Sequence, residues 1–286
     1  MFFDIALSHG LSIDMIVGNH CTYHKNTNEI NSPELLLSDY KNIRVFEKPT
    51  TIEIDSVKIC MMPWICSDNY QESTWELSHT EAKLCMGHFE IAGFSMYRGM
   101  TSEDGLERKT FSKFDRTFSG HYHHKSDSNN IYYLGNPYPL TWSDFDDPRG
   151  FHIFDLHTYD LEFIQNPNEM FHKIHYDDVN DSKEHITSIN MTKYTSTYVK
   201  VIVVNKSNPS LFDDFLSRLY ESSPIDVSII EEMIELTDVF DEDSLTIDDT
   251  ISTIDKYVDS VYNDGIDNNK LKTMMREIYV EALSLE

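Results

Sequence analysis

Apolar runs that stop at a glycine recur in the first half of the chain. Residues 13–17, 84–86 and 117–119 each have the pattern of a short strand. Directly after them come Gly18-Asn19-His20, Gly87-His88 and Gly120-His121-Tyr122-His123. In an open α/β sheet, ligand sites gather beyond the carboxyl ends of the strands. We therefore expect an α/β fold in which these polar side chains meet at one edge of a sheet.

The third of these endings carries two imidazoles one residue apart. Alternate residues of an extended strand end point the same way, so His121 and His123 can face one point in space. Gly120 lets the backbone turn where the strand stops. Neutral imidazoles suit zinc, iron and, in mixed nitrogen–oxygen sites, manganese. The alternative is a pair of surface histidines beside a turn, and this stretch by itself leaves both interpretations open.

The rest of the first 175 residues predicts further helices and strands. Residues 13–17 are expected to form a buried parallel strand, and 94–106 a polar loop. The remaining elements, in chain order, are a helix ending near Gly10, a helix with Ser32 as N-cap and Pro33 at its first position, a hairpin within 45–58, a core strand at 58–63, a helix at 75–82, and strands at 131–134 and 150–156 that close a second sheet.

The second half of the chain changes in pattern twice. A strand at 197–204, a helix at 208–220 and a strand at 225–230 make a small βαβ unit. Residues 231–249 are rich in Asp and Glu and contain no basic residue, which is typical of a solvated linker. Residues 251–285 then carry apolar stripes at helical spacing.

Composition narrows the classes of function. The net charge of −26 argues against a freestanding DNA-binding protein, because cations normally neutralise the phosphates. Bound metal ions or a partner could supply that positive charge. The chain has no apolar run of membrane-spanning length, no signal peptide and four cysteines without metal-site spacing, so we expect a cytoplasmic protein with free thiols.

The three glycine endings, taken in order, resemble the calcineurin-like metallophosphoesterase family. Within it the sequence is most similar to the SbcD-type nuclease subunits of DNA repair, in their phage recombination version. Further stretches support the resemblance: Met62-Pro63-Trp64-Ile65, Tyr133-Leu134-Gly135-Asn136-Pro137 and Asp147-Pro148-Arg149-Gly150-Phe151. The likeness runs from the first residue to about residue 175, and more weakly beyond.

The resemblance implies a domain plan. Residues 1–175 would be a four-layer α/β sandwich, the metallophosphoesterase core, and residues 176–232 a capping domain over the active-site groove. Residues 233–250 would be the acidic linker. Residues 251–286 would be helices that dock on an ATPase of the SMC or ABC type, and the alternative is that they pack on their own domain.

The resemblance also implies roles for particular residues. Two divalent metal ions would be bound, manganese being expected and magnesium the alternative. Asn19, His88 and His121 would hold one ion and His123 the other. His20 would be the general acid that protonates the leaving oxygen.

The family pattern is incomplete in this sequence. In the family, strands that come earlier in the sequence carry Asp-x-His and Gly-Asp-x-x-Asp and supply further ligands, and neither motif precedes Gly18-Asn19-His20 here. Cys21 stands where an acid is usual. We therefore expect a core that is truncated at its N-terminus, with weak metal binding and little nuclease activity for this chain alone.

The function expected is that of a metal-dependent DNA nuclease subunit, exo- or endonucleolytic, in a recombination or double-strand-break repair complex. Its partners would be DNA, the ATPase and a second copy of itself, with no membrane, in the cytoplasm of the host cell if a phage encodes it. Two alternatives stay open, a non-catalytic binding subunit of that complex and a small-molecule phosphoesterase.

Overall fold

The structure is a computed structural model that describes residues 2–97, 100–102 and 105–231, and Val258, Leu271, Lys272 and Met275. The chain divides into two compact units, and the first contains residues 1–97 and 101–232. The expected linker at 233–250 and the expected helices at 251–286 lie outside the described residues, apart from the four just named. The following description concerns the first unit.

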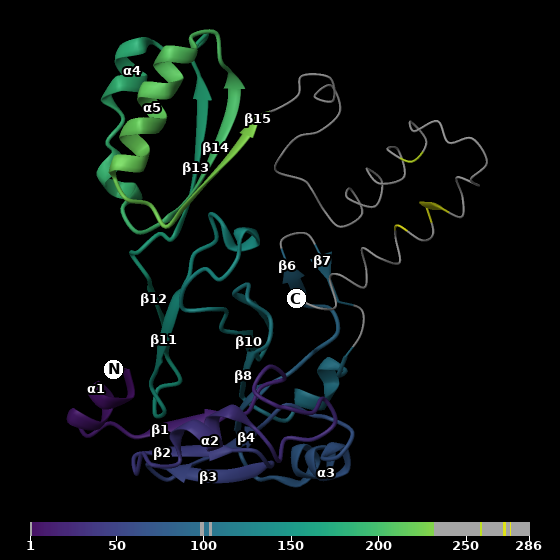
Figure 1. The fold of residues 1–286 in the computed structure, drawn as a ribbon. Helices are drawn as coiled ribbons and strands as arrows, with labels where there is room; N and C mark the ends of the chain where they lie inside the picture. Colours follow the sequence, from purple (N-terminus) through teal and green to yellow (C-terminus); the bar gives the residue numbers. More distant parts are fainter. Residues whose placement is uncertain are drawn as a thin grey trace. The chain divides into compact units, whose positions relative to one another are not determined.

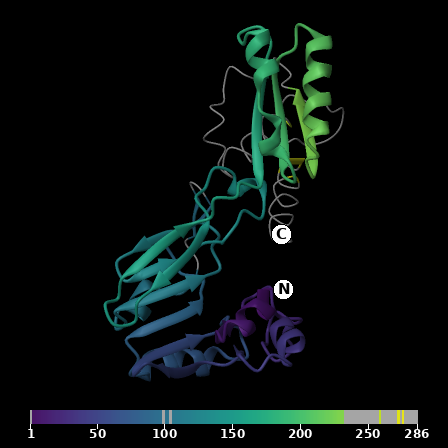
Figure 2. The same ribbon diagram turned by 90° about the vertical axis from the view of Figure 1, so that its left-hand side faces the viewer.

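A six-stranded sheet forms the centre of the first 150 residues. Its strand order is β3-β4-β5-β8-β10-β9, and Figure 2 shows these strands side by side. The inner four strands are parallel to one another, and the two outer strands are antiparallel to their neighbours. The bounds are β3 (Thr50–Ile54), β4 (Val57–Met62), β5 (Leu84–His88), β8 (Arg116–Gly120), β9 (Ser126–Ser128) and β10 (Ile131–Tyr133). The parallel strands therefore end at one edge of the sheet.

Both faces of this sheet are buried, which explains its nearly continuous apolar strands. Cys60 and Met62 of β4 pack on one side in a cluster that includes α3 (Tyr70–His79) and the 3-10 helix η1 (Arg108–Phe111). Ile59 and Met61 alternate to the other side and join a second cluster. That second cluster draws on β1 (Ile13–Ile16), β2 (Ile43–Phe46) and β11 (Gly150–Phe154).

Several of the expected elements are present with altered bounds. Helix α1 spans Phe2–Ser8 and Gly10 follows it with a φ of 68°, as predicted. The expected strand at 13–17 pairs in parallel with β2, as predicted, but only Val17 is buried, and Ile13–Ile16 are half-buried, so the expectation of a buried strand was wrong for most of its length. Helix α3 starts at Tyr70, five residues before the predicted start at residue 75.

The N-cap of the second helix was assigned one residue too late. Helix α2 runs from Ser32 to Leu37, and its cap is Asn31. The Asn31 Oδ1 atom accepts a hydrogen bond from the backbone N–H of Glu34 at 2.9 Å. Pro33 still occupies the first turn, where its missing N–H costs nothing.

Two further expectations fail at the level of sheet membership. The predicted polar loop at 94–106 contains a two-stranded sheet, β6 (Ser95–Tyr97) with β7 (Met100–Thr101). The strands at 131–134 and 150–156 do not close one sheet. The first is β10 of the six-stranded sheet, and the second is β11, which pairs with β12 (Leu161–Gln165). The described residues are thus mixed α/β with several separate sheets, and the four-layer arrangement stays a prediction.

The region after residue 170 forms a parallel three-stranded sheet with helices on one face (Figure 1). Its strands are β13 (Phe171–Asp177), β14 (Tyr198–Asn205) and β15 (Asp226–Glu231), and α4 (Lys183–Ser188), the 3-10 helix η3 (Met191–Tyr194) and α5 (Pro209–Glu221) connect them. The strand, helix and strand predicted between 197 and 230 are confirmed. Strand β13 and helix α4 were not predicted, and β13 begins before the expected boundary at residue 176.

Apolar packing explains why the helices cover that face. Leu211, Phe212, Phe215 and Leu219 of α5 are all buried against alternate residues of β13 and β14. Pro209 begins the helix and Asn208 caps it through a hydrogen bond from Leu211 N–H at 3.2 Å. No helix among the described residues is long and apolar enough to cross a membrane.

Two buried hydroxyl groups fix the chain just after β5, where His88 stands. The Tyr133 hydroxyl donates to Phe89 O at 2.9 Å and accepts from Ile91 N–H at 3.1 Å. Ser119 Oγ accepts from Phe89 N–H at 3.0 Å. Burial raises the pKa of the Tyr133 phenol, so it stays a donor. The segment that follows His88 is therefore tied to β8 and β10 by hydrogen bonds.

We expect Tyr133→Phe to lower the free energy of unfolding by about 1–3 kcal/mol, because two buried backbone groups lose their partner. Urea denaturation measures the change. Tyr132→Phe is the matched control, since its half-buried ring packs on Phe118 and its hydroxyl makes no hydrogen bond to a described residue. Equal losses in the two variants would contradict this explanation.

Candidate active site

Asn19 and His88 come from different sheets and meet through a side-chain hydrogen bond. Asn19 follows β1 in a turn that Cys21 N–H closes onto Gly18 O at 3.0 Å. His88 is the last residue of β5. Asn19 Oδ1 and His88 Nε2 lie 2.8 Å apart. A backbone hydrogen bond from Trp64 N to Val17 O, 2.8 Å long, ties the end of β1 to the segment after β4.

His121 joins this pair through ring contacts. Its ring centroid lies 5.3 Å from that of His88, in an edge-to-face arrangement. The indole of Trp64 lies against both rings, with centroid distances of 6.1 Å to His88 and 5.2 Å to His121. Trp64 thus forms one wall of the candidate site. In the sequence analysis, Trp64 appears only within the Met62-Pro63-Trp64-Ile65 stretch, and no role was predicted for it.

Two glycines leave room for the His88 ring. A Cβ atom on Gly18 would lie 3.0 Å from His88 Cε1, and one on Gly120 would lie 2.9 Å from His88 Nδ1. Both positions precede a candidate ligand in the chain. The glycines that end the apolar runs therefore allow a close approach of backbone to imidazole.

The backbone at His121 corrects one step of the sequence argument. Strand β8 ends at Gly120, and His121 has a φ of 85°. His121 and His123 are therefore not alternate positions of one extended strand, and the geometric reason given for their common direction was wrong. The left-handed turn is made by His121 itself. Such a backbone is uncommon for residues other than glycine, although histidine is among those enriched there.

Four imidazoles influence one another at this edge. Burial, followed by the neighbouring histidines His121, His20 and His123, lowers the pKa of His88 to about 4. Burial, His20 and His123 likewise lower the pKa of His121 to about 4. Both rings are therefore neutral at pH 7, the state in which a ring nitrogen can bind a metal ion.

His123 and His20 stand at the more open side of the group. His123 is half-buried, and burial lowers its pKa, while the charge of Asp144 acts in the opposite direction. His20 is exposed in the turn after Asn19. Its neighbour Cys21 is a half-buried free thiol. All four cysteines are free, and the other three are buried.

A cavity of about 300 Å³ opens beside His88. Trp64, Tyr70 and Glu90 contribute to its wall, together with apolar side chains. The cavity gives the His88 side of the group a hollow that a small polar group could enter.

The donor set fits one divalent ion in its chemistry. Asn19 offers an amide oxygen, and His88 and His121 offer neutral imidazoles, a mixture that suits manganese. His123 is the one donor left for a second ion among the expected ligands. Within the described residues, no three His, Cys, Asp or Glu side chains are arranged to hold a metal ion. The set therefore fits one ion by donor type and does not by itself make a two-ion site.

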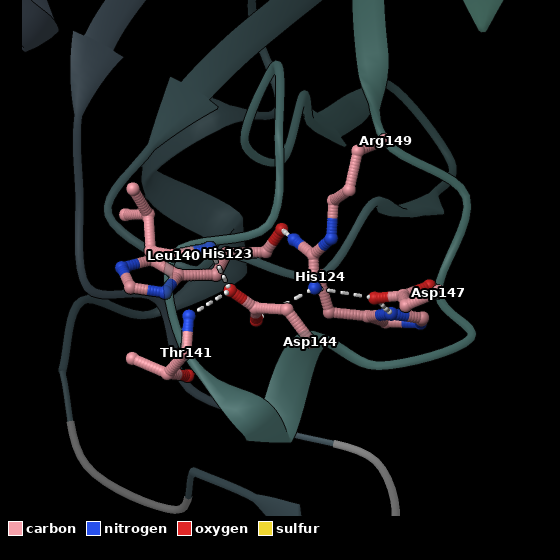
Figure 3. Close-up of polar contacts among 7 residues, drawn as sticks. All are labelled: His123, His124, Leu140, Thr141, Asp144, Asp147 and Arg149. Atoms are coloured by element: carbon pink, nitrogen blue, oxygen red, sulfur yellow. Dashed lines mark hydrogen bonds and ion pairs between the residues drawn. The ribbon is translucent and has the colours of Figure 1, made fainter. Parts of the chain in front are cut away.

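Sequence reasoning missed a charged network behind His123. Figure 3 shows Arg149 between two carboxylates, with its guanidinium directed at the backbone of His123. His124, which is not among the expected site residues, contacts Asp147 through Nδ1 at 2.8 Å. The signal in the sequence was the Asp147-Pro148-Arg149 stretch, where charged residues stand directly before a strand.

We expect Gly120→Ala to displace the His88 ring, because the added methyl group would lie 2.9 Å from His88 Nδ1. Loss of the contact with Asn19 should change the ring-nitrogen signals of His88 in long-range ¹H–¹⁵N spectra. Overpacking should also lower the free energy of unfolding by about 1–3 kcal/mol.

The control is Gly10→Ala, where a Cβ would meet nothing within 4 Å and only the positive φ resists the change. It should destabilise the chain without moving His88. Unchanged His88 signals in Gly120→Ala would show that the glycine is not needed for the ring.

Comparison with known proteins sets this arrangement in a family. No protein-family model matches the chain. Exonuclease subunit 1 of Enterobacteria phage T4 is 32% identical over 275 residues, which cover 96% of this chain and 78% of the phage protein. Identity at this level along nearly the whole chain confirms the resemblance drawn from the short motifs. The chain therefore belongs to the family of SbcD-type nuclease subunits, together with this phage T4 protein.

Proposed function

We propose that this chain is the nuclease subunit of a recombination or repair complex and hydrolyses phosphodiester bonds of DNA. The observation that supports it most is the contact of Asn19 with His88 at 2.8 Å, with His121 packed against the same ring. These residues come from three strand ends that are far apart in the sequence. The similarity to a phage exonuclease subunit supports the same reaction.

Each residue of the group has a proposed role. Asn19, His88 and His121 would hold one divalent ion, manganese being the first choice, and His123 would belong to a second. A bound ion of this kind supplies a hydroxide-like nucleophile and neutralises charge on the phosphate. His20 is exposed beside the group, a position from which its imidazole could give a proton to the leaving oxygen.

The charge of the donor set bears on the strength of binding. Amide and imidazole donors are uncharged, whereas hard divalent ions favour anionic oxygen ligands. The charges that act on His88 and His121 come from other histidines. We therefore expect this chain alone to bind its ion weakly and to cut DNA slowly.

The proposed complex includes an ABC-type ATPase and a second copy of the chain. The relative in phage T4 is named a subunit, which supports an assembly with a partner. The region at 251–286 would dock on the ATPase, and all but four of its residues lie outside the described part of the chain. Because the relative is a phage protein, we propose that the complex acts in the cytoplasm of the infected cell.

The β13–β14–β15 unit would serve as the capping domain and contact the DNA backbone. Lys173 and Lys200 are direct partners in the register of β13 and β14, on the face that the helices leave open. Lys200 Nζ lies 4.3 Å from the ring centroid of Trp142, and Lys173 Nζ lies 4.8 Å from that of Phe145. No ion pair joins either lysine to a described carboxylate.

This lysine pair favours DNA over a small phosphoester as the substrate. Burial, followed by the charge of Lys173, lowers the pKa of Lys200, which indicates two cations held close together. In a chain with a net charge of −26, such a pair marks a local exception. Cations beside aromatic rings are typical of surfaces that bind single-stranded nucleic acid.

The nuclease proposal predicts manganese-dependent cleavage of linear DNA by the purified chain. His88→Gln should reduce the rate by more than the roughly 10- to 100-fold that loss of an outer contact costs a metal site. His79→Gln is the control, because His79 stacks on Trp75 at 4.6 Å on the surface of α3. A chelator should abolish cleavage. Equal rates for the wild type and His88→Gln would reject the proposed site.

The proposed DNA contact predicts a change in salt dependence. Replacing Lys173 and Lys200 by Gln should lower the slope of log Kd against log salt concentration by about one for each lysine. Fluorescence anisotropy with labelled single-stranded DNA measures it. The control is Lys58→Gln, which removes a lysine of β4 that forms an ion pair with Glu81. An unchanged slope in the double variant would place the DNA elsewhere.

A further inference from the structure

Arg149 is a buried cation that contacts two buried carboxylates. Its side chain is 4% exposed, and those of Asp144 and Asp147 are 2% and 8% exposed. The Nη2 atom lies 2.8 Å from Asp144 Oδ1 and 2.7 Å from Asp147 Oδ2. The third contact differs in kind, because Nη1 donates to the backbone carbonyl oxygen of His123 (Figure 3).

The same carbonyl oxygen is held from another side. The backbone N–H of Asn136 donates to His123 O at 3.1 Å. A Cβ atom on Gly135 would lie 2.8 Å from this oxygen, and Gly135 has a φ of 71°. The peptide that follows His123 is therefore enclosed by Arg149 and by the 135–136 turn.

The two carboxylates extend the hydrogen-bond network from Arg149 to the 140–144 turn and to His124. Asp144 Oδ2 accepts hydrogen bonds from the backbone N–H groups of Leu140 at 2.8 Å and Thr141 at 3.2 Å. Asp147 Oδ2 contacts His124 Nδ1 at 2.8 Å. Arg149 thus links the 140–144 turn to two consecutive residues of the candidate site, His123 through its backbone and His124 through its side chain.

Stabilising the 135–149 segment would not by itself require a buried charged side chain at position 149. Burying ionised groups is costly, and a well-packed apolar side chain of similar volume often stabilises a fold at least as well. What an apolar residue could not do is donate several directed hydrogen bonds at once. The planar guanidinium does this because its donors have a fixed geometry.

We propose that Arg149 is a positioning residue, which fixes the backbone of His123 so that its imidazole points toward His20, His88 and His121. This inference rests on the proposed nuclease function, in which His123 would be a ligand of the second metal ion. Arg149 acts through His123 and touches no substrate. Asp144 and Asp147 orient the guanidinium for that task.

The deciding variant is Arg149→Lys. Lysine keeps the positive charge beside Asp144 and Asp147, but a single ammonium cannot reproduce the fork that reaches all three acceptors. A purely electrostatic role would survive this change, whereas positioning of His123 would not. Arg44→Lys is the matched control, since Arg44 makes a forked pair with Asp14 at 2.6 and 2.7 Å between β1 and β2.

The first readout needs neither metal nor cleavage. In long-range ¹H–¹⁵N spectra of the full chain, Arg149→Lys should shift or broaden the His123 ring signals more than those of His88, and leave those of the remote His79 in place. Arg44→Lys should leave all of them in place. His123 signals that match the wild type in Arg149→Lys would overturn the inference, even if the chain cuts DNA.

The second readout is catalytic. With manganese and linear DNA, Arg149→Lys should lower kcat by roughly 10- to 100-fold, the usual effect of losing an outer contact of a site, with KM little changed. A wild-type kcat in this variant would also overturn the inference. A wild-type chain that does not cut DNA would reject the proposed function, and the spectra would still decide the role of Arg149.

A second variant is needed in case Arg149→Lys does not fold. Thermal unfolding shows whether Arg149→Lys retains a cooperative transition. If it does not, Asp147→Asn takes its place, because it keeps the size of the side chain and loosens one arm that orients the guanidinium. It should move the His123 signals in the same way, and unchanged signals there would overturn the inference.

Discussion

One side-chain hydrogen bond connects two sheets that share no backbone ladder. Asn19 follows a strand of the β1–β2 pair, and His88 ends a strand of the six-stranded sheet. Asn19 and His88 are 69 positions apart in the sequence, and the chain between them forms β2, β3 and β4 and the helices α2 and α3 before it reaches β5. The bond from Trp64 to Val17 brings the two strand ends to the same edge, and the histidine of β5 then reaches the amide after β1. Without that alignment, the polar endings of the apolar runs would be unrelated surface groups.

The electrostatics of the site are unlike those of the chain as a whole. The protein is strongly acidic, yet the pKa values of His88 and His121 are lowered by burial and by neighbouring histidines. Asp144, whose charge acts on His123, and Asp147 are both engaged by Arg149. The guanidinium thereby offsets the negative charge of these two carboxylates beside His123.

Sequence reasoning succeeded where local chemistry decides the outcome. Apolar runs closed by glycine marked β1, β5 and β8, and those of β5 and β8 reflect burial within the six-stranded sheet. It found the Pro209 helix because a capping residue, a proline and an apolar stripe agree there. Similarity to a known family then connected the endings into one site, and the T4 relative confirms that family.

Sequence reasoning failed where contacts between residues far apart in the chain determine the structure. The ring of His88 leaves no space for a Cβ at Gly120, and His121 takes a left-handed backbone; no local sequence pattern reports either feature. Membership of β10 and β11 in different sheets depends on which partner strand is available. The sequence analysis quoted Arg149 within a motif, but its burial and its hydrogen bond to the His123 carbonyl oxygen depend on how the 135–149 segment folds.

The left-handed backbone at His121 restricts what evolution can place there. Holding a residue other than glycine in that region costs about 1–3 kcal/mol, although histidine, asparagine and aspartate tolerate it better than most. Glycine would relieve the strain at once, and a β-branched residue would worsen it. His121 therefore stands where stability alone would favour glycine, and the proposed role of its imidazole as a metal ligand would offset that cost.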